Sequence, residues 1–253
     1  MPPLSGQTII FLPGIDGTGI SFDPFRAVLP DDVHVNIIRY PTDRLLSFEE
    51  MVCSAKRQIQ SHQKGAIILA ESFSGLVAIA LVGSRQIEAN CLILCSTFAR
   101  SPRPVLLKVF GYLPLEPLIK LPLPVFIFKL MIGCDEETAK LFLAMWQKVK
   151  TLVPEKVLIH RLKLISQVDV RDWLPKVLIP SLYIQATADR SVPASSLFDF
   201  VESVPDLRVR RISGPHFILQ AQPRASLDAI EDFLELITRQ WHQCRKGTKL
   251  EKL

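Results

Sequence analysis

Short runs of apolar, often β-branched residues alternate along the chain with longer segments whose apolar positions recur every three to four residues. Such alternation is typical of a parallel sheet whose strands are connected by helices. The short runs predict strands at residues 8–12, 33–40, 66–70, 91–95, 181–185 and 207–212. The segments between them predict helices at 22–29, 73–84, 194–204 and 225–242. A further helix is predicted to begin at Ser47, which forms a capping box with Glu50. The sequence therefore predicts an α/β fold with a mainly parallel sheet of about six strands and helices on both faces.

The alternation breaks down between residues 101 and 174. Six prolines between residues 102 and 124 interrupt an apolar, aromatic stretch, and a proline inside a helix removes a hydrogen-bond donor and clashes with the preceding turn. We therefore expect a cap of short helices, with clearer helical spacing at 135–149 and 158–165. This divides the chain into a first part of the core at 1–100, a helical cap insertion at 101–174, and a second part of the core at 175–253.

Composition fits a single globular domain of this kind. The chain has 253 residues, of which 48% are hydrophobic and 22% charged, a balance that supports a large buried core. The net charge is +5, but the densest basic run is the tail with Arg245, Lys246, Lys249 and Lys252. We expect this tail to be solvated, and the dispersed charge predicts no nucleic-acid partner.

Neither secretion nor membrane insertion is indicated. The first residues lack the basic segment and long apolar stretch of a signal peptide. The longest uncharged apolar stretch, 72–84, is shorter than the roughly 18 to 20 residues that span a bilayer. Five cysteines without a CxxC pair indicate neither a disulfide framework nor a metal site. We therefore expect a cytoplasmic protein without stable membrane insertion.

A serine stands where a buried strand gives way to a helix, in the sequence LAESFSG at residues 69–75. A nucleophile elbow at such a junction needs small residues two positions before and two positions after the serine, because the turn is tight. Ala70 and Ser74 meet this need, although the usual motif has glycine at both positions. Ser72 is therefore a candidate nucleophile, and a helix cap is its alternative role.

A glycine-rich loop, PGIDGTG at residues 13–19, follows the first strand. A serine hydrolase of this fold places there the loop that donates one amide to the oxyanion hole. We predict the backbone N–H groups of Ile15 and Phe73 as the two donors. A phosphate-binding loop is the competing interpretation, but neither the GxGxxG spacing nor a following GK[ST] is present, and Asp16 would repel phosphate. We expect Asp16 to order the loop.

A candidate acid and a candidate base follow the last two predicted strands. Asp189 lies in ATADRSVP at 186–193, and His216 lies in SGPHF at 213–217. Serine, then aspartate, then histidine is the order that this fold requires along the chain. Of the five histidines, His216 alone follows a strand in a Gly-Pro turn. We therefore predict a triad of Ser72, Asp189 and His216, with Glu71 as a supporting group.

On these motifs the chain resembles the α/β-hydrolase superfamily over nearly its whole length, and small esterase-like serine hydrolases in particular. Its PGIDGTG loop is similar to that of the phytyl ester synthase group. The resemblance implies a sheet of eight strands. Few residues precede the first strand here, so we expect the first two strands to be missing and the core to be a reduced, six-stranded version.

Substrate choice depends on the cap. Phe110, Phe126, Phe142 and Trp146 stand among many leucines, and we predict that they line an apolar acyl pocket. The alternative is that they only pack the cap against the sheet.

The predicted activity is hydrolysis of carboxylic esters of apolar or acyl-type small molecules through an acyl-enzyme. This chemistry needs no metal and no organic cofactor. Thioester cleavage or acyl transfer by the same triad remains an alternative, and so does a non-catalytic ligand-binding role. The acyl chain, the acceptor and the oligomeric state stay open.

Overall fold

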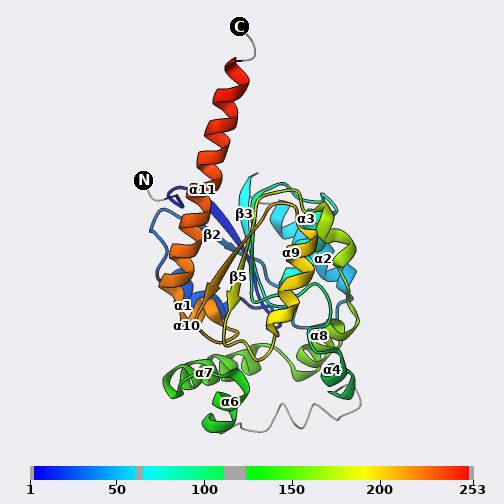
Figure 1. The fold of residues 1–253 in the computed structure, drawn as a ribbon. Coiled ribbons are helices and arrows are strands. Elements are labelled where there is room, and N and C mark those ends of the chain that lie inside the picture. The colour runs from blue at the N-terminus through cyan, green and yellow to red at the C-terminus, as the bar shows by residue number, and fades with distance from the viewer. Residues whose placement is uncertain (1–2, 61–64, 111–123, 251–253) are drawn as a thin grey trace.

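Six parallel strands form one sheet in the order β2-β1-β3-β4-β5-β6 (Figure 1). The computed structural model describes residues 3–60, 65–110 and 124–250. The strands are β1 (Thr8–Leu12), β2 (His34–Ile37), β3 (Ala66–Glu71), β4 (Ala89–Cys95), β5 (Ser181–Ala186) and β6 (Leu207–Ile212). The predicted fold class is thus confirmed.

Both faces of the sheet are buried, because alternate residues of each strand point to opposite sides. In β1, Ile10 and Leu12 belong to the core on one face, and Ile9 and Phe11 to the core on the other. The first face is covered by α2 (Phe48–Gln60), α3 (Ser74–Gly83), η2 (Arg171–Lys176) and α9 (Phe198–Ser203). The second is covered by α1 (Asp23–Arg26), α10 (Ile218–Ala221) and α11 (Pro223–Leu250), which lie on the opposite side of the sheet in Figure 1.

Several predicted helices have different bounds in the structure. The segment predicted as one helix at 22–29 forms a 3-10 turn, η1 (Ile20–Phe22), and then the single turn α1, which has a proline in its first turn. The segment 194–204 likewise divides into η3 (Ala194–Leu197) and α9. The last helix, α11, continues to Leu250 instead of ending at 242, and β2 is shorter than predicted.

The capping box of α2 forms as predicted. The backbone N–H of Ser47 donates to Glu50 Oε2 over 2.8 Å, and the N–H of Glu50 donates to Ser47 Oγ over 3.2 Å. These two bonds satisfy donors that the first helical turn leaves unpaired.

Between β4 and β5 the chain forms α4 (Pro104–Phe110), α6 (Val125–Ile132), α7 (Glu136–Leu152) and α8 (Glu155–Gln167). Figure 1 shows these helices together at one end of the sheet, away from the free end of α11. Helices α6 and α8 each begin directly after a proline, which is well tolerated at a helix start. We refer to these four helices as the cap. In the part of the chain that the structure describes, no helix is both long and apolar enough to cross a bilayer.

Candidate active site

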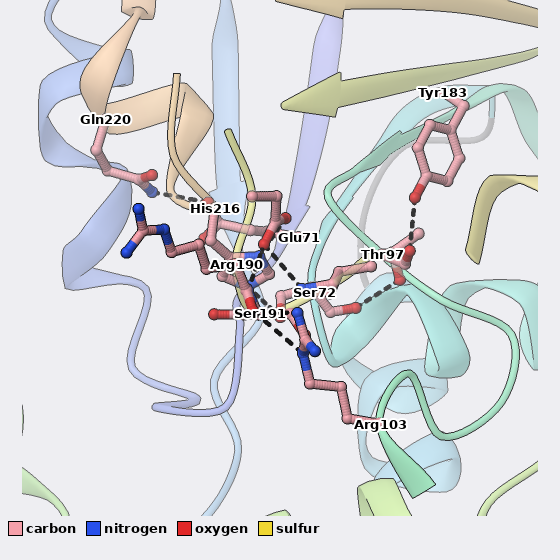
Figure 2. Close-up of polar contacts among 11 residues, drawn as sticks. Glu71, Ser72, Thr97, Arg103, Tyr183, Arg190, Ser191, His216 and Gln220 are labelled. Carbon is pink, nitrogen blue, oxygen red and sulfur yellow. Dashed lines mark hydrogen bonds and ion pairs between the residues drawn. The ribbon is translucent and has the colours of Figure 1, made fainter. Parts of the chain in front are cut away.

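Ser72 occupies a tight turn between β3 and α3, with a backbone φ of 51°. A non-glycine residue is strained in this left-handed region, so the turn has to be held by its surroundings. The Ser72 N–H donates to the Cys95 carbonyl over 2.9 Å, and Thr97 Oγ1 donates to the Ser72 carbonyl over 2.6 Å. The Tyr183 hydroxyl in turn donates to the Thr97 carbonyl over 2.6 Å (Figure 2). Strands β4 and β5 therefore fix the conformation of Ser72.

Small residues around Ser72 allow this close packing. A Cβ atom added to Gly75 would lie 1.9 Å from Thr97 Oγ1, which explains why the first turn of α3 has glycine there.

Ser74, where the usual motif has glycine, is fully buried and makes use of its hydroxyl. Its Oγ donates to the Pro13 carbonyl and lies 2.8 Å from the hydroxyl of Tyr40. The serine that replaces the usual glycine thus links the turn at Ser72 to the glycine-rich loop through a hydrogen bond.

The three residues predicted as a triad come together at the carboxyl ends of the strands. His216 Nε2 lies 2.9 Å from Ser72 Oγ, and His216 Nδ1 lies 2.7 Å from Asp189 Oδ2. The carboxylate can only accept, so Nδ1 carries the proton and Nε2 is free to accept from the serine hydroxyl. The His216 and Asp189 side chains are only 7% and 5% exposed.

The loop that carries Asp189 is held by its own backbone N–H groups and by Arg103, which directly precedes the cap. Asp189 Oδ1 accepts from the backbone N–H groups of Ser191 and Val192, each over 2.8 Å. Arg103, just before α4, donates to the carbonyls of Arg190 over 2.7 Å and Ser191 over 3.3 Å (Figure 2). The carboxylate is therefore oriented with one oxygen toward the imidazole.

The pKa of His216 reflects opposing effects. Burial disfavours the charged imidazolium, but the negative charge of Asp189, its hydrogen bond and the charge of Glu71 outweigh burial and raise the pKa. A raised pKa suits a group that must first take a proton and then return it.

The glycine-rich loop, residues 13–19, lies beside the serine turn. The Gly17 N–H donates to the Gly14 carbonyl over 3.1 Å, and Asp16 Oδ2 accepts from the N–H groups of Thr18 over 2.8 Å and Gly19 over 3.2 Å. Asp16 thus orders the loop, as the sequence predicts. Among the described residues, the N–H groups of Ile15 and Phe73 donate to no protein group.

Glu71 ends β3 with a side chain that is almost fully buried. Its Oε1 accepts from Gln220 Nε2 over 2.9 Å (Figure 2). Burial raises the pKa of Glu71 to about 7, against the opposing effects of the Gln220 hydrogen bond and the positive charge of His216. A charged residue at the end of an otherwise apolar strand is the sequence signal for this buried carboxyl.

Of the four aromatic residues predicted to line an acyl pocket, the structure places one beside the loop of His216. Phe142 is buried and its ring lies 5.0 Å from that of Phe217. Trp146 is partly buried against a small cluster at the end of α7, and Phe126 is 70% exposed. The side chain of Phe110 lies outside the described residues.

A groove of about 620 Å³ runs along the glycine-rich loop. Its lining includes Gly17 and Thr18 from that loop, Tyr40 and Pro41 from the segment after β2, and Leu152 at the end of α7. Of the predicted aromatic residues whose side chains are described, Phe126, Phe142 and Trp146, none lines it. No local pattern in the sequence marks this groove, because its walls come from segments far apart in the chain.

The described part of the chain offers no candidate metal site, and the two cysteines of β4 are buried. Cys91 and Cys95 are buried in β4, and burial raises the pKa of the Cys91 thiol to about 12. No cluster of three or more His, Cys, Asp or Glu side chains there could hold a metal ion.

No family model matches the sequence. A stretch of 123 residues is 31% identical to phytyl ester synthase 1, chloroplastic, of Arabidopsis thaliana, and covers 46% of this chain but only 18% of that much longer relative. This match supports the resemblance to the phytyl ester synthase group.

Solved structures resemble nearly the whole chain. An enol-lactonase from Burkholderia xenovorans superimposes with a TM-score of 0.72 at 18% identity, covering 91% of this chain and 92% of that one. An esterase from Exiguobacterium antarcticum gives a TM-score of 0.73 at 14% identity with the same coverage of both chains. At these identities the likeness concerns the fold. The chain therefore has the α/β-hydrolase fold, in a six-stranded form with a helical cap segment between β4 and β5.

Proposed function

We propose that this protein is a serine hydrolase that cleaves carboxylic esters of apolar or acyl-type small molecules through an acyl-enzyme on Ser72. The observation that carries the proposal is the continuous hydrogen-bonded chain from Ser72 Oγ through His216 to Asp189. Three side chains separated by 144 and 27 positions along the sequence meet in this geometry. Such an arrangement is the recognised signature of nucleophilic serine catalysis.

In the proposed acylation, Ser72 Oγ attacks the ester carbonyl carbon while His216 Nε2 takes the hydroxyl proton. Asp189 stabilises the resulting imidazolium. The carbonyl oxygen becomes an oxyanion that accepts hydrogen bonds from the N–H groups of Ile15 and Phe73, which have no protein acceptor among the described residues. Loss of one such donor lowers kcat by about 10²–10³ in a well-studied protease.

Collapse of the tetrahedral intermediate breaks the bond to the alcohol oxygen, and His216 returns its proton to that leaving group. A water molecule then attacks the acyl carbon of the ester on Ser72 and gives its proton to His216. The second tetrahedral intermediate releases the carboxylic acid and regenerates the Ser72 hydroxyl. Every proton taken by His216 is therefore returned within one cycle.

Acyl transfer to an acceptor other than water is a second candidate, because the curated relative that matches 46% of this chain is called an ester synthase. The same acyl-enzyme would pass its acyl group to an alcohol, or would be formed from a thioester. Turnover of acyl-CoA and of a simple aryl ester, measured side by side with and without a long-chain alcohol, separates the two. Ester formation that outpaces hydrolysis favours the synthase.

Labelling with a fluorophosphonate probe, followed by peptide mass spectrometry, tests the nucleophile. We expect the label on Ser72, no label in Ser72→Ala or after His216→Ala, and loss of p-nitrophenyl ester turnover in Ser72→Ala with the fold intact. Ser166→Ala serves as the matched control, since Ser166 is an exposed serine of α8, and it should behave as wild type. Esterase activity retained by Ser72→Ala refutes the assignment.

A further inference from the structure

Arg161 of the cap helix α8 reaches into the glycine-rich loop and is only 2% exposed. Its Nη1 donates to the carbonyls of Ile15 over 3.0 Å and Asp16 over 2.6 Å, and its Nη2 donates to the Pro41 carbonyl over 3.0 Å. Among the described residues, no carboxylate lies within ion-pair distance of this guanidinium. Three backbone carbonyls and the face of the Tyr40 ring, 5.7 Å away, surround the buried charge instead.

The loop is shaped to receive this guanidinium. Gly17 has a φ of +70°, and a Cβ atom there would lie 2.4 Å from Arg161 Nη1. The left-handed backbone and the missing side chain together leave room for the arginine. Arg161 thus occupies a place that a side chain at position 17 would fill.

The contacts of Arg161 bear on the proposed oxyanion donor itself. The Ile15 N–H belongs to the peptide whose carbonyl, that of Gly14, accepts from the Gly17 N–H. The next carbonyl, that of Ile15, is one of the groups that Arg161 holds. Residue 15 is therefore fixed on both sides, from within the loop and from the cap, and its N–H is left without a protein acceptor in the described part of the chain.

We propose that Arg161 is a positioning residue that orients the Ile15 N–H toward the oxyanion. The geometry of the oxyanion hole then depends on the position of the cap helix α8 relative to the core. The inference rests on the proposed hydrolase function. Arg161 does not touch the substrate; it acts through the backbone of residues 15 and 16. A purely structural arginine would contribute to stability without any preference for the transition state.

Because an oxyanion exists only in the tetrahedral states, a misplaced donor weakens binding of those states more than binding of the ester. A displacement of about 1 Å is enough to reduce the rate about 100-fold. Loss of Arg161 should therefore lower kcat and leave KM nearly unchanged. It should also weaken a trifluoromethyl ketone inhibitor, whose adduct with Ser72 carries an oxyanion.

The test compares Arg161→Met, Arg161→Lys and Lys163→Met by p-nitrophenyl ester kinetics and trifluoromethyl ketone inhibition. We expect Arg161→Met to lower kcat by about 100-fold with KM within about threefold of wild type, and to raise the inhibition constant by the factor by which kcat/KM falls. Arg161→Lys should be intermediate, because an ammonium offers its three donors from a single point. Lys163→Met removes an exposed charge from the same helix and should match wild type.

A wild-type kcat in Arg161→Met, or a loss of ester turnover without a matching loss of inhibitor binding, overturns the inference. If Arg161→Met does not fold, Arg161→Lys decides by the same kinetics: unchanged kcat overturns the inference, and a kcat reduced at nearly constant KM supports it. Failure of the proposed function has a different signature. In that case the wild-type protein itself neither hydrolyses esters nor takes the fluorophosphonate label at Ser72.

Discussion

Replacing Glu71 with glutamine tests whether a buried carboxyl titrates beside His216. Burial raises the pKa of Glu71 to about 7, from an ordinary value of 4.5. Since the folded-state pKa is the higher one, the stabilising contribution of the protonated carboxyl is fully present below about pH 4.5 and is lost as the pH rises through about 7. At 1.36 kcal/mol for each pKa unit, the whole loss amounts to about 3 kcal/mol. A glutamine side chain keeps the size and the acceptor oxygen but cannot ionise.

We therefore expect the stability of Glu71→Gln relative to wild type to increase with pH. The difference in free energy of unfolding, variant minus wild type, should rise by up to about 3 kcal/mol between about pH 4.5 and about pH 8. Urea denaturation followed by circular dichroism at several pH values measures the difference. Glu202→Gln, at an exposed position of α9, is the control and should show no such trend. A constant difference between Glu71→Gln and wild type across this range refutes the reasoning.

The same variant has a kinetic consequence. The negative charge of Glu71 is one of the causes that raise the pKa of His216. Its removal lowers that pKa, so the imidazole stays unprotonated and able to act as a base at lower pH. The acid limb of the kcat/KM profile should move to lower pH, and a shift in the opposite direction would contradict the arrangement around His216.

Two further substitutions test the packing of the serine turn. Ser74→Ala leaves the Pro13 carbonyl and the Tyr40 hydroxyl without their partner, so the free energy of unfolding should fall by about 1–3 kcal/mol. In a double-mutant cycle with Tyr40→Phe the combined loss should be smaller than the sum, whereas strict additivity would argue against the link. Gly75→Ala places a Cβ 1.9 Å from Thr97 Oγ1, and thermal denaturation should show a loss of about 1–3 kcal/mol together with slower labelling of Ser72. Unchanged stability and labelling would show that the turn does not depend on this close approach.

Local sequence patterns were sufficient for the sheet and for the placement of Ser72, Asp189 and His216. Buried strands are short apolar runs, and in a parallel sheet the residues that follow them meet at one edge. Glycine and proline mark the turns that carry these residues, so their structural context could be predicted from neighbours in the chain.

Contacts between distant segments could not be predicted in this way. Arg161 lies 145 positions from Asp16, and nothing near it in the sequence marks it as a partner of the glycine-rich loop. The serine at position 74 departs from the usual glycine of the motif, and the sequence alone gives no reason for it. In the structure its hydroxyl donates a hydrogen bond to the Pro13 carbonyl. Phe126 was predicted to line an acyl pocket, and its side chain is 70% exposed in the structure. Aromatic character alone does not determine which way a side chain faces, because an apolar residue on a short helix can also face outward.

The hold of Arg161 on the glycine-rich loop bears on any attempt to redesign the specificity of this protein. Substrate range in such a scaffold would ordinarily be altered by exchanging the cap while keeping the core intact. Here the conformation of the glycine-rich loop, which belongs to the core, depends in part on Arg161 of the cap helix α8. On the proposed role of Arg161, a transplanted cap without an arginine at the equivalent place would leave the Ile15 N–H wrongly positioned, so a graft should keep residues 155–167 together with the core.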